Sequence, residues 1–174
     1  MINFKSELAV YAEAIETFRL EYELPNEWFA RPDHVAIKCA DSTDYDSMVG
    51  EWLPSATHCY YVHLNNRRLG TAKLLSPIAI GNLGTVQWLE IMEPRPEKVG
   101  IDPVGVDHME FDFVGFNAAE EILNAKGVSY ERQKNPNQEW LSIMAHGHEF
   151  KLSSKPLDDI IAAELASGAA TVLK

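Results

Sequence analysis

Two short stretches of the chain, Asp33-His34-Val35-Ala36-Ile37 and Asp107-His108-Met109-Glu110-Phe111, decide its fold. Both follow the pattern Asp-His-apolar-x-apolar, and His108 follows His34 by 74 residues. This spacing is too long for the repeat of a solenoid protein. One ancestral half-domain used twice explains it better, and this origin would relate the two histidines by a pseudo-twofold axis.

Both stretches alternate between two faces, as strands do. His34 and Ala36 share one face of the first strand, and His108 shares one face of the second with Glu110. The other face is apolar in both, and we expect it to pack against helices. The residues predicted on this apolar face are Val35, Ile37, Met109, Phe111 and Phe113. We expect the two histidines to face a shared cavity.

The elements after each stretch follow the same order. After the first, the pattern predicts a helix over about 45–52 and strands at 59–64, 69–75 and 85–92. After the second, Asn117 caps a helix to Lys126, and strands are expected at 128–131, 138–144 and 149–152. Each half therefore has the order β, α, β, β, β.

Two further helices are expected outside the repeat. The first covers about 5–22, with an apolar face that we predict to include Leu8, Tyr11, Ile15, Phe18 and Leu20. The second starts at Pro156 and ends near Leu165. We expect a single domain, 1–174, divided into an N-terminal helix and entry (1–31), module one (32–93), module two (104–153) and a C-terminal helix (154–174).

Composition and charge exclude several functions. A chain of 174 residues, 46% of them hydrophobic, can bury a core of its own. Its 15 basic and 26 acidic residues give a net charge of -11, which opposes binding to nucleic acid. No apolar stretch is long enough to span a membrane, and Glu7 interrupts the start where a signal peptide is apolar. We expect a soluble cytoplasmic protein without a membrane partner.

Two βαβββ units that each open with a histidine-bearing strand resemble the vicinal oxygen chelate superfamily, the fold of glyoxalases and extradiol dioxygenases. The resemblance implies an α+β fold in which curved mixed sheets form a cup, here with an added N-terminal helix. It also implies metal ligands on the first and fourth strands of each unit. Carried over to this sequence, these are His34, His108 and, from the apolar-Glu-apolar strand 86–91, Glu90.

A closer resemblance is to the YecM-like branch of the superfamily. It rests on Pro32-Asp33-His34-Val35-Ala36-Ile37, on Arg67-Arg68-Leu69-Gly70-Thr71-Ala72-Lys73-Leu74, and on Phe150-Lys151-Leu152 followed by Pro156-Leu157-Asp158-Asp159-Ile160-Ile161. This resemblance covers nearly the whole chain and implies metal binding without naming a reaction.

The fourth strand of the second unit departs from the glyoxalase pattern. Counted from Gly147, Lys151 stands where glyoxalases carry their last glutamate, and Glu149 precedes it on the same face. Two residues along a strand span roughly 6.8 Å, too far for Glu149 to replace that ligand in the same register. We therefore expect three protein ligands rather than four.

Two histidines and one carboxylate suit a divalent transition metal, which could be Zn, Ni, Mn, Fe or Co, and leave positions open for a ligand with two oxygens. Such an ion could polarise a carbonyl or stabilise an enolate. The candidate catalytic residues are Lys151, which could pair with a substrate carboxylate, and Glu149 or Glu110, either of which could act as a base if burial raised its pKa.

Three classes of function remain open from the sequence. The first is a metal-dependent enzyme of isomerase, lyase or dioxygenase type that acts on a small oxygen-chelating, anionic substrate. The second is a metal-free module that binds or sequesters a small molecule, and the third is an interaction protein with an acidic surface. The matched histidines favour the first class, because a sequestering protein has no need for them. His146 and His148, beside Gly147, are expected in a turn and not at the metal.

Overall fold

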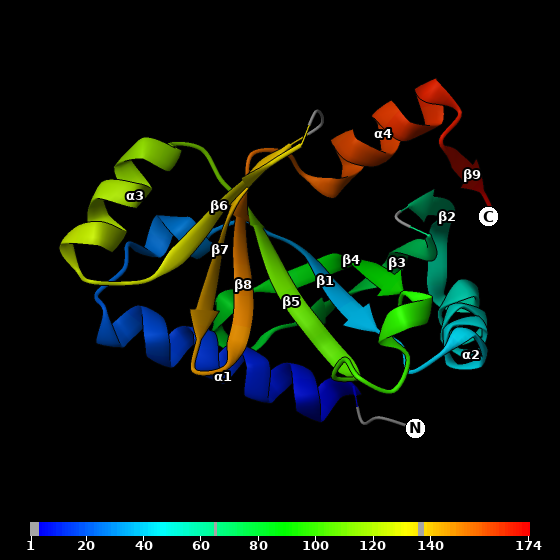
Figure 1. The fold of residues 1–174 in the computed structure, drawn as a ribbon, viewed down its shortest axis with the longest axis horizontal. Helices are drawn as coiled ribbons and strands as arrows, with labels where there is room; N and C mark the ends of the chain where they lie inside the picture. Colours follow the sequence, from blue (N-terminus) through cyan, green and yellow to red (C-terminus); the bar gives the residue numbers. More distant parts are fainter. Residues whose placement is uncertain (1–3, 65, 136–137) are drawn as a thin grey trace.

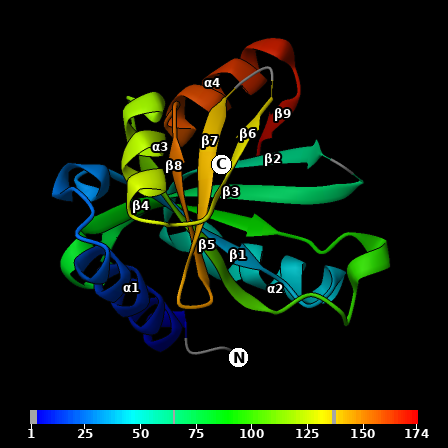
Figure 2. The ribbon, with the colours of Figure 1, turned by 60° about the vertical axis from the view of Figure 1, so that its left-hand side comes forward.

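The computed structural model describes residues 4–64, 66–135 and 138–174. One nine-stranded sheet with the order β6-β7-β8-β5-β1-β4-β3-β2-β9 forms its centre (Figure 1). The sheet is curved and does not close. Seen from the side, the strands of its two halves run in clearly different directions, as expected for a strongly twisted sheet (Figure 2).

The repeated order predicted from the sequence is confirmed. Module one contains β1 (Pro32–Lys38), α2 (Ser42–Trp52), β2 (Ala56–Leu64), β3 (Arg67–Ala79) and β4 (Thr85–Met92). Module two contains β5 (Gly105–Asp112), α3 (Phe116–Ala125), β6 (Tyr130–Lys134), β7 (Glu139–Ala145) and β8 (His148–Ser153).

The first strands of the two modules join the halves at the middle of the sheet. β1 pairs with β4 in parallel, and β5 pairs with β8 in parallel. β1 and β5 are antiparallel to each other, with His34 opposite Glu110 and Ala36 opposite His108. This pairing is the pseudo-twofold arrangement expected from the repeat, and it places both histidines on adjacent central strands.

The helices α1, α2 and α3 cover the apolar face of the sheet. The five side chains predicted on that face, Val35, Ile37, Met109, Phe111 and Phe113, all lie in the main hydrophobic core. The helix α1 (Phe4–Glu21) contributes Leu8, Tyr11, Ile15 and Phe18 to this core. Alternation along the strands therefore leaves His34 and His108 on the opposite face.

The prediction of the apolar face of the first helix was wrong for one residue, Leu20. Leu20 is 59% exposed. It follows Phe18 by two residues, which places it about 200° around the helix and so on the face turned away from the sheet. A spacing of two is a strand spacing, and it does not extend a helical stripe.

The C-terminal segment lies on the face that α1 leaves free (Figure 1). The helix α4 (Leu157–Ser167) was expected and packs Leu157 and Ile161 against Trp88 of β4. The strand β9 (Ala170–Val172), which the sequence analysis did not predict, adds an antiparallel edge to β2. Gly168, with φ of 76°, makes the left-handed turn between them. The C-terminal segment thus covers part of the sheet face that carries His34 and His108.

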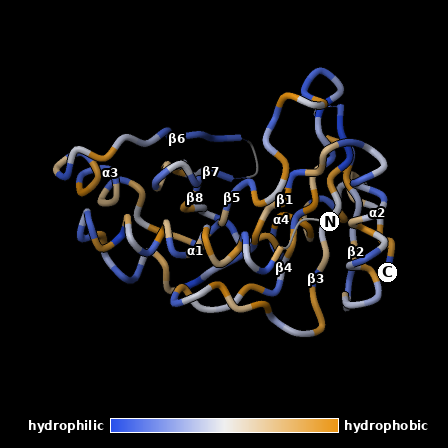
Figure 3. Tube along the Cα trace, turned by 90° about the horizontal axis from the view of Figure 1, so that it is seen from below, coloured by the Kyte–Doolittle hydropathy of each residue, from blue (hydrophilic) through white to orange (hydrophobic). Residues whose placement is uncertain are grey.

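The other edge of the sheet is polar. β6 has the sequence Tyr-Glu-Arg-Gln-Lys, and Figure 3 shows it as a hydrophilic edge. Charged side chains on an edge strand oppose pairing with other chains. Cys39 and Cys59 are free and buried. Within the described residues, the structure has no helix whose length and apolar character would allow it to cross a membrane.

Candidate metal centre

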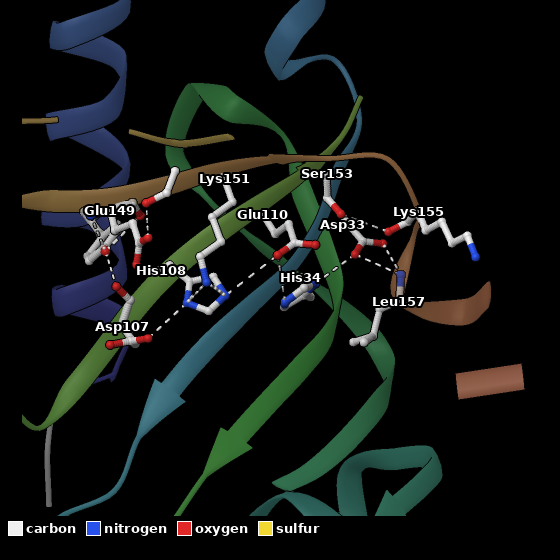
Figure 4. Close-up of polar contacts among 12 residues, drawn as sticks. Asp33, His34, Asp107, His108, Glu110, Glu149, Lys151, Ser153, Lys155 and Leu157 are labelled. Atoms are coloured by element: carbon white, nitrogen blue, oxygen red, sulfur yellow. Dashed lines mark hydrogen bonds and ion pairs between the residues drawn. The ribbon is translucent and has the colours of Figure 1, made fainter. Parts of the chain in front are cut away.

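The structure brings together the three side chains that the sequence analysis selected as metal ligands. One donor atom each from His34, Glu90 and His108 lies within 4.8 Å of the others. The two imidazole rings are 5.7 Å apart between centroids, and both are almost fully buried (Figure 4). They line a cavity of about 480 Å³, which we call the cup. The adjacent strands β1 and β5 therefore supply the two histidines, and β4, which pairs with β1, supplies Glu90.

An aspartate precedes each histidine and fixes its ring. Asp33 Oδ2 lies 2.8 Å from Nδ1 of His34, and Asp107 Oδ2 lies 3.0 Å from Nδ1 of His108. A carboxylate at Nδ1 keeps the proton on that nitrogen in a neutral ring and leaves Nε2 free to bind a metal. The sequence analysis used these aspartates only as part of the repeat. Their position next to each histidine was the available signal for this orienting role.

The two aspartates are themselves held by different partners. Asp33 accepts a hydrogen bond from the backbone N–H of Leu157, the first residue of α4, at 3.0 Å. Asp107 forms an ion pair with Nζ of Lys38 at 2.7 Å. His34 is therefore connected through Asp33 to α4, and His108 is connected through Asp107 to β1.

Glu110 lies between the two rings. Its Oε2 is 3.8 Å from Nε2 of His34 and 3.9 Å from Nε2 of His108. Its Oε1 is buried and has no hydrogen-bond partner. Burial raises the pKa of this carboxyl group above its usual value, although His34 and Lys151 oppose the shift. Glu110 therefore has one oxygen, Oε2, near both Nε2 atoms, and a second, Oε1, that is buried without a hydrogen-bond partner, as in sites that a bound cation or ligand completes.

The two histidines differ in protonation. Burial would lower the pKa of His34, but the carboxylates of Glu110, Asp33 and Glu90 outweigh it and raise this pKa to about 9. Burial and the ammonium group of Lys151 lower the pKa of His108 to about 3. A proton on His34 thus supplies the positive charge that this acidic surrounding favours, and His108 is neutral and ready to act as a ligand.

Lys151 reaches the cup, as the sequence analysis expected. It lies opposite Glu110 in the register of β8 and β5, and its Nζ is 3.3 Å from both ring nitrogens of His108. Glu149 lies opposite His108 on the same face of β8, with a donor atom within 4.8 Å of donor atoms of Asp107 and His108. It accepts a hydrogen bond from the Ser142 hydroxyl and lines a separate cavity. The structure therefore brings Lys151 and Glu110, but not Glu149, into the lining of the cup.

The sequence analysis missed several residues of the cup wall. Arg67 and Thr71 come from β3, and Glu164 comes from α4. Thr71 lies opposite Glu90 in the pairing of β3 with β4, so strand alternation could have placed both β3 residues on this face. Glu164 could not be placed in this way, because its position depends on how α4 folds back over the sheet.

The histidines beside Gly147 lie away from the cup. The ring of His148 packs edge-on against Tyr11, with centroids 4.5 Å apart. Nε2 of His146 is 3.1 Å from a carboxylate oxygen of Glu21. Both contacts are with α1, on the opposite face of the sheet from the cup.

Comparisons with known proteins establish the fold. No protein-family model and no curated protein sequence matches the chain. Among solved structures, Protein EC4020 from structural genomics has a TM-score of 0.75 and 17% identity over 93% of this chain and 91% of its own. Methylmalonyl-CoA epimerase from Mycobacterium tuberculosis has a TM-score of 0.53 and 16% identity over 76% and 91%. Hypothetical protein BH1468 from Bacillus halodurans C-125 has a TM-score of 0.51 and 13% identity over 72% and 94%.

The chain has the vicinal oxygen chelate fold. This prediction is confirmed by the two βαβββ modules, their pairing through β1 and β5, and the structural likenesses. Membership of the YecM-like branch stays a prediction. At such low identities the likeness extends to the fold alone, so the function has to be argued from the residues of the cup.

Proposed function

We propose that this protein binds one divalent transition metal ion through His34, Glu90 and His108 and holds a small ligand beside it in the cup. The observation that carries the proposal is the matched pair of Asp–His units that converge on Glu90. A single buried histidine is often no more than part of the core. Two of them, each oriented by an aspartate and each directing Nε2 to the same cavity, support a ligand set.

The donor types fit Zn, Ni, Mn, Fe or Co. Two imidazole nitrogens and one carboxylate suit these ions and leave positions open for two ligand oxygens. The free Oε1 of Glu110 supports the same interpretation, because a bound cation would stabilise a carboxylate oxygen that has no hydrogen-bond partner among the described residues.

An ion held by His34, Glu90 and His108 would polarise a carbonyl group of the ligand and stabilise negative charge that develops next to it. Glu110 is the side chain best placed to accept a proton from the ligand, because its Oε1 is free and its pKa is raised by burial. Leu157 and Ile160 of α4 line the cup and limit the access of water. An isomerase or lyase reaction that begins with proton removal next to a carbonyl is the activity that this arrangement supports best.

Metal analysis of the protein purified without a histidine tag tests this proposal. We expect close to one transition metal ion per chain. After stripping, addition of Mn(II), Fe(II), Co(II), Ni(II) or Zn(II) at about 100 times Kd should raise Tm by about 5 to 10 °C. His108→Ala should lower metal affinity by at least about 100-fold, because it removes one of the three protein ligands.

His148→Ala is the matched control, since His148 lies on the other face and packs against Tyr11. It should leave metal affinity within about twofold of the unchanged protein, well inside a 1.4 kcal/mol difference. Equal effects of the two substitutions would contradict the ligand set. If none of the five ions binds, the cup is instead a metal-free binding site for a small molecule.

A further inference from the structure

Polar side-chain atoms without a partner are concentrated in the cup. Among the described residues, six buried side-chain nitrogen or oxygen atoms have no hydrogen-bond partner. Four of them belong to residues that line the cup: Arg67 Nε, Thr71 Oγ1, Glu110 Oε1 and Trp140 Nε1. Buried polar atoms are normally paired, so this concentration indicates a place that a ligand completes. Arg67 and Trp140 can only donate, which calls for acceptor oxygens on that ligand.

Lys151 provides a cation on one side of the cup. The only acceptors within reach of its Nζ in the described part of the chain are the ring nitrogens of His108, both at 3.3 Å. Because Nδ1 of His108 is paired with Asp107, the lone pair that Lys151 can use is the one on Nε2. A metal bound to Nε2 would take that lone pair, and the ammonium group would then need another acceptor, one that carries negative charge.

Arg67 provides a cation on the other side. Its Nε is buried without a partner, and no ion pair joins it to a carboxylate of residues 4–64, 66–135 or 138–174. It also lines a smaller cavity of about 260 Å³ next to the cup, with Lys38, Arg95, Lys98, Asp102 and Asp107. There Lys38 pairs with both aspartates, and Lys98 pairs with Asp102. Arg67, unlike Lys38 and Lys98, has no carboxylate partner among the described residues, and an unpaired arginine at the cup favours an anionic ligand.

The order of the strands places the two cations on either side of the proposed metal ligands. Lys151 is on β8, next to the strand of His108, and Arg67 is on β3, next to the strand of Glu90. A ligand held at the centre of the cup therefore has one cation on each side.

We propose that the ligand of the cup is a small dianionic acid. One carboxylate lies between the metal ligands and Lys151, and a second anionic group, a carboxylate or a phosphate, lies at Arg67. This inference rests on the proposed metal site and names the class of molecule that the site accepts. The cup volume of about 480 Å³ is suitable for a molecule of this size.

Isothermal titration calorimetry of the Mn(II)-loaded protein tests the inference with lactate, malate and 3-phosphoglycerate. All three carry a 2-hydroxy carboxylate, and they differ in whether a second carboxylate or a phosphate is present. We expect malate or 3-phosphoglycerate to bind at least about tenfold more tightly than lactate. The tighter of the two identifies the second anionic group.

Two substitutions separate the two ends of the ligand. Arg67→Met should reduce the affinity of the tighter dianion to that of lactate and leave lactate unchanged. Lys151→Met should weaken all three by about tenfold or more, with metal content unchanged or increased. Lys151→Gln is a second neutral variant should Lys151→Met fail to fold. Lys155→Met is the matched control, because Lys155 is exposed and points away from the cup (Figure 4).

Equal affinity for lactate and both dianions, or unchanged affinities in Lys151→Met, would overturn the inference while metal binding remains intact. A protein that takes up no Mn(II) and none of the other four ions would contradict the proposed function itself. Measuring the metal content before each titration keeps the two failures distinct.

Discussion

The two modules share a backbone plan but carry different side chains at matched positions. Each has a histidine on its first strand, His34 in one and His108 in the other. Two residues later, module one has Ala36 and module two has Glu110. Opposite these positions, on the fourth strands, lie Glu90 in module one and Lys151 in module two.

The difference shows how a duplicated fold can divide one task. The small side chain of Ala36 leaves Glu90 free to reach the metal position, so module one offers a histidine and a carboxylate. In module two the carboxylate lies on the first strand, as Glu110, and a lysine faces it from the fourth. We infer that module one binds the metal more completely, and that module two supplies the proton acceptor and the cation for the ligand.

The aspartates before the histidines offer the largest test of this comparison. Because each fixes its ring through Nδ1, Asp33→Asn and Asp107→Asn should each lower metal affinity by about 10- to 100-fold. Asp33→Asn should also lower Tm, since Asp33 accepts the first N–H of α4. Metal titration followed by calorimetry, with thermal melting of the stripped proteins, measures both effects.

Asp112→Asn is the control for these two variants. Asp112 is on the same strand as Asp107, but it pairs with the exposed Arg31 outside the cup. Its metal affinity should not change. If only one of Asp33→Asn and Asp107→Asn loses metal affinity, only that aspartate orients its histidine for metal binding. The two modules would then match in their histidines but not in the role of the preceding aspartates.

A double substitution that makes module two a copy of module one gives a smaller effect of opposite sign. Lys151→Glu combined with Glu110→Ala would place a carboxylate on the fourth strand and an alanine opposite it. This creates a fourth protein ligand and removes a repelling cation, so metal affinity should rise by about tenfold. Lower affinity than in the unchanged protein would show that Lys151 and Glu90 do not occupy equivalent positions.

Most of the fold and the centre of the site could be predicted from the sequence because they depend on local alternation and on the repeat. His34, Glu90 and His108 needed only their strand positions and the resemblance to be placed together. The position of Lys151 on the cup face also followed from counting along one strand. These predictions use neighbours in sequence, where the geometry of a strand is fixed.

The remaining features depend on contacts between distant segments. The side chain of Glu149 is oriented by the Ser142 hydroxyl on β7. The part of the cup wall that α4 supplies depends on how α4 packs over β4. The edge strand β9 exists because β2 leaves an unpaired edge beside it. None of these partners can be identified from alternation, since each depends on which segments meet in space.

The smallest effect expected is a difference in the pH dependence of the two histidines in the metal-free protein. The pKa of His34 is raised to about 9 and that of His108 is lowered to about 3, against a usual value near 6.5. The contribution of His34 to the stability of the folded protein is therefore complete below about pH 6.5 and is lost as pH rises through about 9.

His108 affects stability in the opposite direction, because as pH falls below about 6.5 the unfolded chain binds a proton at His108 before the folded protein does. Together they should place the highest stability of the metal-free protein near pH 6.5, with a loss of stability towards pH 9. Bound metal should abolish that loss, because His34 then carries no proton to release. NMR titration of the imidazole C–H signals, with urea unfolding at several pH values, measures both. If both histidines titrate near pH 6.5, the different charges around them in the two modules do not shift their pKa values.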